Sequence, residues 1–360
     1  MPITGWECFL VETPTHADLT TTYGAPERLR PRVVVRLTDD EGHEGLGEAS
    51  PLPFFTGETA ASIKLQLEQR FLPALVGRDP FDHDAIMAVL DDLLPANTSA
   101  KSAVDMALYD LRGKILGRPV YQLLGGLRCP EGFEVTRPIG ICPVDEAVEQ
   151  ALHWTGLGFK TLKMKVGTDP DRDIERVLAV RRAVPGARIR IDANQGYDLP
   201  SAIKVLRAVG DAVEYCEQPL PAWDIQGLRT LRAATGVRIT LDEAVHNVRD
   251  LIRACTAEAV DAIVIKLIKC GGLRAAERLA GTAAAYGIGT VVVSTFDLHV
   301  GAAACVHLAM SLASTAYAQE LSLFCVDPEG PYTRADVPTT GSRILPPAAP
   351  GLGATFRAPA

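Results

Sequence analysis

The spacing of apolar and polar positions changes near residue 130 of this chain. Before that point, β-rich stretches at 6–11, 32–37 and 45–49 precede segments whose apolar residues recur at helical spacing. In the segment 103–117, one helix face collects Val104, Ala107, Leu108, Leu111 and Ile115. The pattern predicts an α+β domain over residues 1–128.

From about residue 132, a strand-like run followed by an amphipathic helical stretch recurs. The runs are 134–141, 160–166, 188–193, 212–217, 238–243, 261–266, 289–294 and 316–321. Their ends recur about every 24–28 residues, which is typical of eight β/α units and predicts an α/β chain with a TIM-type (β/α) barrel over 129–324. We expect the tail, from about 325 to 360, to complete the N-terminal domain. An open doubly wound sheet is the alternative, but no glycine fingerprint follows the first strand.

Composition and charge argue against nucleic-acid-binding, membrane-spanning and secreted proteins. The chain of 360 residues has a net charge of −8 and no block of basic residues, which argues against nucleic acid as a partner. No apolar run is long enough to span a membrane, and the N-terminus lacks the basic and apolar regions of a signal peptide. The eight cysteines show no zinc-type spacing and fit reduced thiols, so we expect a cytoplasmic protein.

Acidic residues interrupt the apolar pattern where predicted barrel strands end. Asp192, Glu217 and Asp242 end the third, fourth and fifth strands. Because the carboxyl ends of barrel strands share one rim, the three acids should converge, and like charges that close need a cation. Oxygen ligands favour a hard ion, so we expect Mg²⁺, or Mn²⁺ in its place. The alternative is that these acids only pair with lysines in a structural ion network.

Lysines flank the acidic set on both sides. Lys163 and Lys165 end the second strand on one face, and Lys266 ends the sixth strand. A lysine near other cations loses proton affinity, so Lys163 can help Lys165 to act as a base. Bases on opposite faces of an α-carbon, beside a metal-held carboxylate, are what a racemase or epimerase needs to move a proton through an enediolate.

These residues and their contexts resemble the enolase superfamily, in its muconate-lactonizing subgroup. The matching motifs are TLKMKVG (161–167), RIDANQGY (190–197), YCEQPL (215–220), LDEAV (241–245) and IKLIKCGG (265–272), and the segment GLGEASPLPFFTGET (45–59) resembles dipeptide-epimerase members. The resemblance implies a modified barrel with an α+β capping domain, and it implies a homo-oligomer. It also implies Mg²⁺ on the three acids, with Lys165 and Lys266 as acid/base residues, a pairing known from that superfamily.

Two strand ends depart from the pattern of that subgroup. Many members carry a Glu at the end of the seventh strand, where this chain has Asp297. Dipeptide epimerases carry D-x-D at the eighth strand, where this chain reads Glu320-Leu321-Ser322, which argues against an ordinary dipeptide substrate. Arg137 on the first strand either points inward and clamps a second substrate carboxylate or points outward and pairs with a helix acid.

Two loops of the N-terminal domain, 20–24 and 53–56, are expected to close over the site, because an enolate must be kept from water. Alternatively, these loops only pack locally. The residues assigned to substrate binding are Thr22, Tyr23, Phe54, Phe55, Arg137, Asn194, Asp297, Glu320 and Ser322. His299 is assigned a surface or supporting role, because the sixth strand ends in Lys266 rather than in the Asp that a catalytic His would need.

The sequence thus predicts a Mg²⁺-dependent isomerase of a small carboxylate substrate: a racemase, epimerase or cycloisomerase. The same site could eliminate water from a β-hydroxy acid, so a dehydratase or lyase is the close alternative. A metal-free Schiff-base aldolase with Lys266 as the nucleophile is a second alternative, which leaves the three acids without a role. A non-catalytic small-molecule binder is a third, and the full set of acids and bases argues against it.

Overall fold

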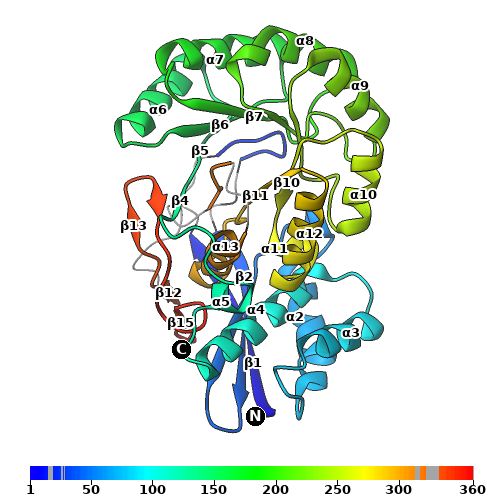
Figure 1. Ribbon diagram of the computed structural model, residues 1–360, viewed down its shortest axis with the longest axis vertical. Helices are drawn as coiled ribbons and strands as arrows, with labels where there is room; N and C mark the ends of the chain where they lie inside the picture. Colours follow the sequence, from blue (N-terminus) through cyan, green and yellow to red (C-terminus); the bar gives the residue numbers. More distant parts are fainter. Residues whose placement is uncertain (15–18, 26, 28, 313–316, 322–331, 360) are drawn as a thin grey trace.

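The computed structural model describes residues 1–14, 19–25, 27, 29–312, 317–321 and 332–359. Its α-helices are α1 (Pro53–Thr56), α2 (Ala60–Gln66), α3 (His83–Leu93), α4 (Thr98–Ile115), α5 (Val120–Leu123), α6 (Val144–Gly156), α7 (Pro170–Ala183), α8 (Leu199–Val209), α9 (Ile225–Thr235), α10 (Val248–Thr256), α11 (Leu267–Cys270), α12 (Leu273–Ala285) and α13 (His299–Ser311). Its strands are β1 (Ile3–Pro14), β2 (Leu29–Asp39), β3 (Glu44–Ala49), β4 (Phe133–Glu134), β5 (Arg137–Ile139), β6 (Thr161–Lys165), β7 (Arg188–Asp192), β8 (Cys216–Glu217), β9 (Ile239–Leu241), β10 (Ala262–Ile265), β11 (Gly289–Val292), β12 (Thr333–Ala335), β13 (Thr339–Thr340), β14 (Arg343–Ile344) and β15 (Ala354–Phe356). Figure 1 shows a curled sheet with α6 to α10 around its outside in one half of the molecule, and β1 with α2 to α4 in the other.

The N-terminal half is built on an antiparallel sheet of order β1-β2-β3, with α4 packed against it. The predicted apolar face of α4 is buried, with Val104, Ala107, Leu108 and Leu111 fully inaccessible. Glycine allows this close packing, since a Cβ at Gly47 would lie 1.8 Å from the backbone oxygen of Ala103. The strands and the long helix expected before residue 128 are therefore present.

The second half is a parallel sheet of order β11-β10-β9-β8-β7-β6-β5, with helices connecting successive strands on its outside (Figure 1). Its strand residues are mostly buried, as expected for a parallel sheet covered by helices, although β6 and β7 also carry charged side chains. Two isolated parallel bridges, Val135 with Gln319 and Val293 with Glu320, join the two edges through the predicted eighth run. The predicted TIM-type barrel with an α+β cap is confirmed.

The first predicted run, 134–141, differs from a single barrel strand. Phe133 and Glu134 form β4, which pairs with the tail strand β14, and the barrel pairing begins only with β5. The tail also contacts the N-terminal half, since Asp110 Oδ1 accepts the backbone N–H of Leu352 at 2.7 Å. These contacts accord with a tail that packs back on the cap, and the domain boundaries themselves stay a prediction.

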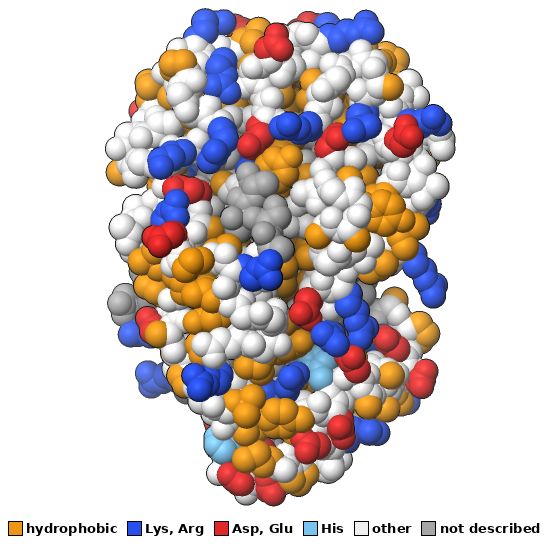
Figure 2. Space-filling view, in the orientation of Figure 1, with side chains coloured by type: hydrophobic (Ala, Val, Ile, Leu, Met, Phe, Trp, Pro, Cys, Tyr) orange, Lys and Arg blue, Asp and Glu red, His pale blue; other side chains and the backbone are white. Residues whose placement is uncertain are grey.

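Acidic and basic side chains are interspersed on the face shown in Figure 2, with apolar atoms between them. Among the described residues, no helix combines the length and the apolar character that crossing a membrane requires. The seven cysteines in the described part of the chain are all free thiols.

Candidate active site

A cavity of about 630 Å³ lies between the carboxyl ends of the barrel strands and the loops of the N-terminal half. Its barrel wall includes Lys163, Lys165, Asp192, Glu217 and Lys266. The parallel register explains this gathering, because Lys165 is paired with Asp192, and Asp192 with Glu217. Residues paired across parallel strands point to the same face, so these side chains meet at one rim.

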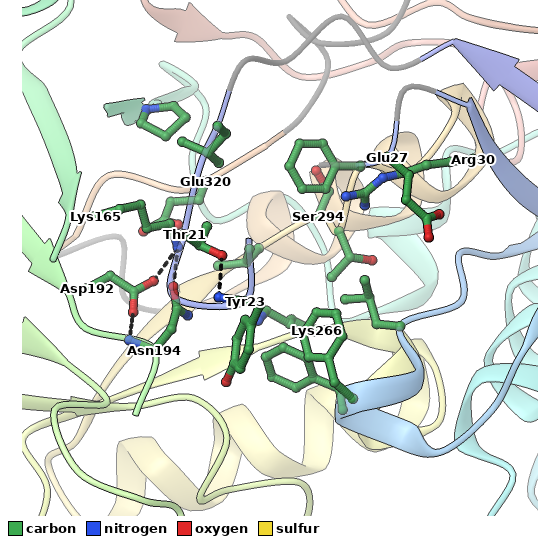
Figure 3. Close-up of a pocket in the computed structure, with 18 of the residues that line it drawn as sticks. Thr21, Tyr23, Glu27, Arg30, Lys165, Asp192, Asn194, Lys266, Ser294 and Glu320 are labelled. Carbon is green, nitrogen blue, oxygen red and sulfur yellow. Dashed lines mark hydrogen bonds and ion pairs between the residues drawn. The ribbon is translucent and has the colours of Figure 1, made fainter. Parts of the chain in front are cut away.

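Both lysines of β6 form ion pairs with carboxylates. Lys163 Nζ lies 2.8 Å from both Glu217 Oε1 and Glu320 Oε2, and 3.1 Å from Asp192 Oδ2. Lys165 Nζ lies 2.6 Å from the same Asp192 oxygen and donates to Asn194 Oδ1 at 3.1 Å. Figure 3 shows Lys165, Asp192 and Asn194 on one side of the cavity, away from Lys266. The two lysines therefore share one buried carboxylate.

Asp242 is held by two further lysines. Lys266 donates to Asp242 Oδ2, and Lys269 Nζ lies 2.8 Å from Oδ1. Lys269 is fully buried and also donates to the backbone oxygens of Asp242 and Val264, at 2.7 and 2.9 Å. Lys266 faces the cavity, whereas Lys269 does not line it. One oxygen of Asp242 is thus held by the fully buried Lys269 and the other by Lys266, and Asp242 itself is not among the residues that line the cavity.

The three acids have the chemistry of cation ligands, although in this structure each of them forms an ion pair with a lysine. No three His, Cys, Asp or Glu side chains in the described ranges are arranged as a metal site. However, Glu217 Oε2 is buried without a hydrogen-bond partner. Burial, and next the negative charge of Asp192, raises the pKa of Glu217 well above its usual range. A buried carboxylate with one oxygen left unpartnered in this way fits a divalent ion as a ligand.

The charges of the site also set the acidity of the lysines. Burial opposes the charged form of Lys163, but attraction to Asp192, Glu217 and Glu320 outweighs it and raises the pKa of Lys163 well above its usual range. The same balance, with Asp242 as the main attracting group, raises the pKa of Lys266. At Lys163 and Lys266 the attraction of neighbouring carboxylates therefore outweighs the cost of burying a charged amine.

The loop around residue 23 reaches the barrel and contacts it by hydrogen bonds. The hydroxyl of Tyr23 donates to Glu243 Oε1 at 2.7 Å and accepts from Gln195 Nε2 at 2.8 Å. Thr22 Oγ1 donates to the backbone oxygen of Asn194 at 3.0 Å. The loop therefore contacts the segments that follow β7 and β9.

Aromatic rings of the cap cover one end of the cavity. The ring centroids of Tyr23 and Phe54 lie 4.5 Å apart, and those of Phe54 and Phe55 lie 5.0 Å apart. Lys266 Nζ lies 3.9 Å from the centroid of Phe55. Tyr23, Phe54 and Phe55 all line the cavity, and their role as a lid stays a prediction. Thr22 is not among its lining residues.

Other predicted residues are divided between the site and its surroundings. Glu320 lines the cavity, and Ser322 lies outside the described residues. Asp297 does not line it: its carboxylate accepts the backbone N–H and the hydroxyl of Thr295 at 3.0 and 3.1 Å. His299 Nδ1 lies 3.0 Å from Thr333 Oγ1, away from the cavity, which fits the supporting role expected for it.

Arg137 adopts the outward orientation of the two that the sequence left open. In the parallel register it is paired with Leu162, whereas Pro138 is paired with the cavity residue Lys163. Although Arg137 borders the cavity, its guanidinium carbon lies 3.9 Å from the ring centroid of Trp154 on α6. The guanidinium therefore makes a cation–π contact with α6.

Two buried residues of this site were not recognised from the sequence, Lys269 and Glu243. Burial, followed by the charges of Asp242 and Asp192, raises the pKa of Glu243 to about 7. The available signals were the second lysine of the motif IKLIKCGG and the Asp-Glu doublet 242–243. Neither residue lines the cavity, so both act through the groups that they contact.

Comparison with known protein families gives two matches, which together span most of the chain. Residues 8–125 match the family model described as the mandelate racemase/muconate lactonizing enzyme N-terminal domain. Residues 146–360 match the model described as enolase C-terminal domain-like.

Characterised relatives are similar over much of their length. The L-Ala-D/L-Glu epimerase of Clostridium acetobutylicum is 37% identical over 281 residues, covering 77% of this chain and 78% of the relative. The N-succinyl-L-Arg/Lys racemase of Bacillus cereus is 34% identical over 314 residues, covering 86% and 85%. The crystal structure of a dipeptide epimerase from Enterococcus faecalis V583, complexed with Mg and the dipeptide L-Leu-L-Tyr, superimposes with a TM-score of 0.91, at 31% identity and coverage of 99% and 100%.

Proposed function

Because the chain belongs to the mandelate racemase/muconate lactonizing enzyme family of the enolase superfamily, we propose that it is a Mg²⁺-dependent racemase or epimerase of a small carboxylate substrate. Membership makes the chain an enolase-superfamily isomerase, like relatives that are named epimerases, racemases and cycloisomerases. One observation carries the finer proposal. The three acids follow or end the neighbouring strands β7, β8 and β9. Lys165 lies on β6, on one side of these strands, and Lys266 follows β10, on the other side. Both amines line one cavity.

Asp192, Glu217 and Asp242 are the residues that would hold Mg²⁺ in this proposal. When bound, the ion would neutralise negative charge on the substrate carboxylate as the α-proton leaves. The unpartnered Glu217 Oε2 supports this assignment. To bind the ion, Asp192 would have to release Lys165, and Asp242 would have to release Lys266. Lys269 would keep its contact with the other oxygen of Asp242.

Lys165 and Lys266 would work from the two sides of the substrate. One amine takes the α-proton, and the ammonium group on the other side delivers a proton to the opposite face. Tyr23 and Phe55 would close the cavity over the planar intermediate and keep water away from it. Asn194, which accepts a hydrogen bond from Lys165, would orient that amine.

The aldolase alternative is disfavoured by a specific observation. A Schiff-base lysine must be neutral to attack a carbonyl, and a metal-free site would leave Lys266 bound to Asp242. That contact raises the pKa of Lys266 rather than lowering it. Cycloisomerisation and water elimination would use the same residues as proton transfer, and no contact among the described residues favours them.

The proposal is tested by incubating the protein with Mg²⁺ and a panel of N-acyl amino acids and dipeptides in D₂O. We expect exchange of the α-proton and conversion of one stereoisomer into the other, detected by NMR and by chiral chromatography. A chelator should stop both, and added Mg²⁺ should restore them. Activity that survives complete chelation, or turnover without any α-proton exchange, would contradict the mechanism.

We also propose that the enzyme works in the cytoplasm as a homo-oligomer. The free thiols in the described part of the chain support the reducing compartment. Fractionation of cells and light scattering of the purified protein test the two statements separately.

A further inference from the structure

An acid of the cap contacts the segment that follows Lys266. Asp105 on α4 is fully buried and does not line the cavity. Its carboxylate accepts the backbone N–H of Leu273, and that of Arg274 at 3.4 Å, at the start of α12. Figure 1 shows α11 and α12 beside α4. The cap is therefore joined to the barrel just beyond α11.

Contacts on two sides fix the position of this carboxylate. His83 Nε2 on α3 lies 2.8 Å from Asp105 Oδ1, and Arg112 Nη1 lies 3.3 Å from His83 Nδ1. On the other side, a Cβ at Gly272 would lie 2.4 Å from the carboxyl carbon of Asp105. Only glycine allows this approach, so Asp105 determines where the backbone of Gly272 and Leu273 can lie.

A single hydrogen-bonded turn connects this contact to Lys266. The backbone oxygen of Lys266 accepts the N–H groups of Lys269 and Cys270 at 3.0 and 3.1 Å. The backbone oxygen of Leu267 accepts the N–H of Gly272 at 2.9 Å. Because these bonds close α11 into one turn, a shift of Gly272 would be transmitted to the backbone of Lys266.

The turn needs an anchor outside itself, because it ends in two glycines. Gly271 and Gly272 have φ angles of +99° and +119°. Glycine adopts such angles readily but adopts many others as well, and a helix this short is not stable by itself. The amine of Lys266 is bound by Asp242 and lies over the Phe55 ring. Once Asp242 releases Lys266 to bind the ion, the place of the amine would depend on its backbone.

We propose that Asp105 is the positioning residue for Lys266. It holds α11 against the cap, and α11 keeps the Lys266 amine at its own face of the substrate. This inference rests on the proposed function for the role of Lys266 in proton transfer. Lys165 belongs to β6, on the other side of the cavity (Figure 3), so its position should not depend on Asp105. The competing explanation is that Asp105 only attaches the cap to the barrel, which would affect both lysines equally.

The two explanations differ in how they affect the two stereoisomers of a substrate. Exchange of the α-proton in D₂O is measured with Mg²⁺ for each pure stereoisomer of the N-acyl amino acid or dipeptide that the wild type exchanges fastest. Lys266→Ala identifies the stereoisomer whose proton Lys266 takes, because its exchange should stop. In Asp105→Ala we expect exchange of that stereoisomer to fall about 10- to 100-fold and exchange of the other to fall less than about threefold.

A second measurement needs no substrate. Amide hydrogen exchange of the Mg²⁺-loaded protein is followed by mass spectrometry at residues 269–272, whose N–H groups bond within α11 and not to Asp105. We expect these amides to exchange at least about tenfold faster in Asp105→Ala, because the turn loses its anchor. Amides of the barrel strand β7 should keep their wild-type rates.

Asp110→Ala is the matched control. Asp110 lies on the same helix, is equally buried and accepts the backbone N–H groups of Leu46 and Leu352, each at 2.7 Å. The control should lose stability without a difference between stereoisomers and without faster exchange at 269–272. If Asp105→Ala does not fold, His83→Ala removes only the contact that orients the carboxylate, and the same asymmetry should appear at about 3- to 10-fold.

Two outcomes would overturn the assignment of Asp105. One is an equal loss of exchange for both stereoisomers, and the other is unchanged amide exchange at 269–272. A wild type that exchanges no α-proton at all would refute the proposed function instead. In that case the amide measurement still decides whether Asp105 holds the segment that carries Lys266.

Discussion

The ammonium group of Lys269 lies 2.8 Å from Oδ1 of Asp242, deep behind the cavity wall. Lys266 binds the other oxygen of this carboxylate and reaches the cavity. A carboxylate held on one side by a fully buried amine keeps its orientation when its outer partner leaves. This arrangement explains how Asp242 could exchange Lys266 for a metal ion without moving.

Replacing Lys269 with Met should therefore destabilise the protein strongly. The change leaves the buried Asp242 with one uncompensated oxygen, and we expect a loss of about 3 kcal/mol in the free energy of unfolding. Denaturant titration measures it. Lys204→Met removes an exposed ion pair with Asp171 and should cost less than about 1 kcal/mol. A similar small effect for both variants would show that Lys269 does not support Asp242.

Removing either cavity lysine should abolish epimerisation while the fold remains intact. We expect Lys165→Ala and Lys266→Ala each to lower kcat by at least about 10³-fold, because each loses one of the two proton-transfer groups. Circular dichroism and thermal unfolding check the fold. Each variant could retain exchange with only one stereoisomer, through the remaining amine. Near-normal kcat in both variants would remove the two-lysine mechanism.

Asp192→Asn should weaken the binding of Mg²⁺. An amide oxygen carries no charge and Lys165 then loses its carboxylate partner, so we expect an affinity at least about tenfold lower. Titration calorimetry of the protein with Mg²⁺ measures it. Asp84→Asn, which alters an exposed acid paired with Arg274, should leave the affinity unchanged. Equal affinity in all three proteins would contradict the ligand assignment.

The hydroxyl of Tyr23 connects the lid to the barrel, so Tyr23→Phe should impair closure. The variant loses hydrogen bonds to Glu243 and Gln195, and we expect kcat/KM to fall about 5- to 10-fold with most of the change in KM. Steady-state kinetics measure the effect. Tyr286→Phe changes an exposed tyrosine at the end of α12 and serves as the control. If the two variants behave alike, the lid contact contributes nothing to binding.

Glu48 should make stability depend on pH. Burial, and next the negative charge of Asp297, raises the pKa of Glu48 from its usual 4.5 to about 7. The folded state therefore keeps a proton that the unfolded chain releases, and this contribution is fully present below about pH 4.5 and lost as the pH rises through about 7.

The corresponding measurement compares the wild type with Glu48→Gln across that pH range. The difference in unfolding free energy, wild type minus variant, should fall by about 1 kcal/mol per pH unit between pH 4.5 and 7. Denaturant titrations at fixed pH values provide it. A difference that stays constant with pH would mean that Glu48 titrates normally in the folded protein.

The residues at the rim of the barrel could be predicted from the sequence. Side chains alternate along a strand, and the β/α spacing fixes where each strand ends, so Lys163, Lys165, Asp192 and Glu217 had to share one rim. The buried face of α4 followed in the same way from helical spacing. Both patterns are local, and a regular element carries them without knowledge of its neighbours.

The partners of these residues depended on the tertiary structure. Tyr23 and Glu243 are 220 positions apart, and Arg137 turned outward because its register pairs it with Leu162. Asp297 was expected at the end of the seventh strand, but β11 ends at Val292, and the Asp297 carboxylate accepts hydrogen bonds from Thr295 away from the cavity. Hydrogen bonds and ion pairs act over a few ångströms between segments that only the complete fold brings together. The sequence therefore determined which groups reach the rim, and tertiary packing decided what each of them contacts.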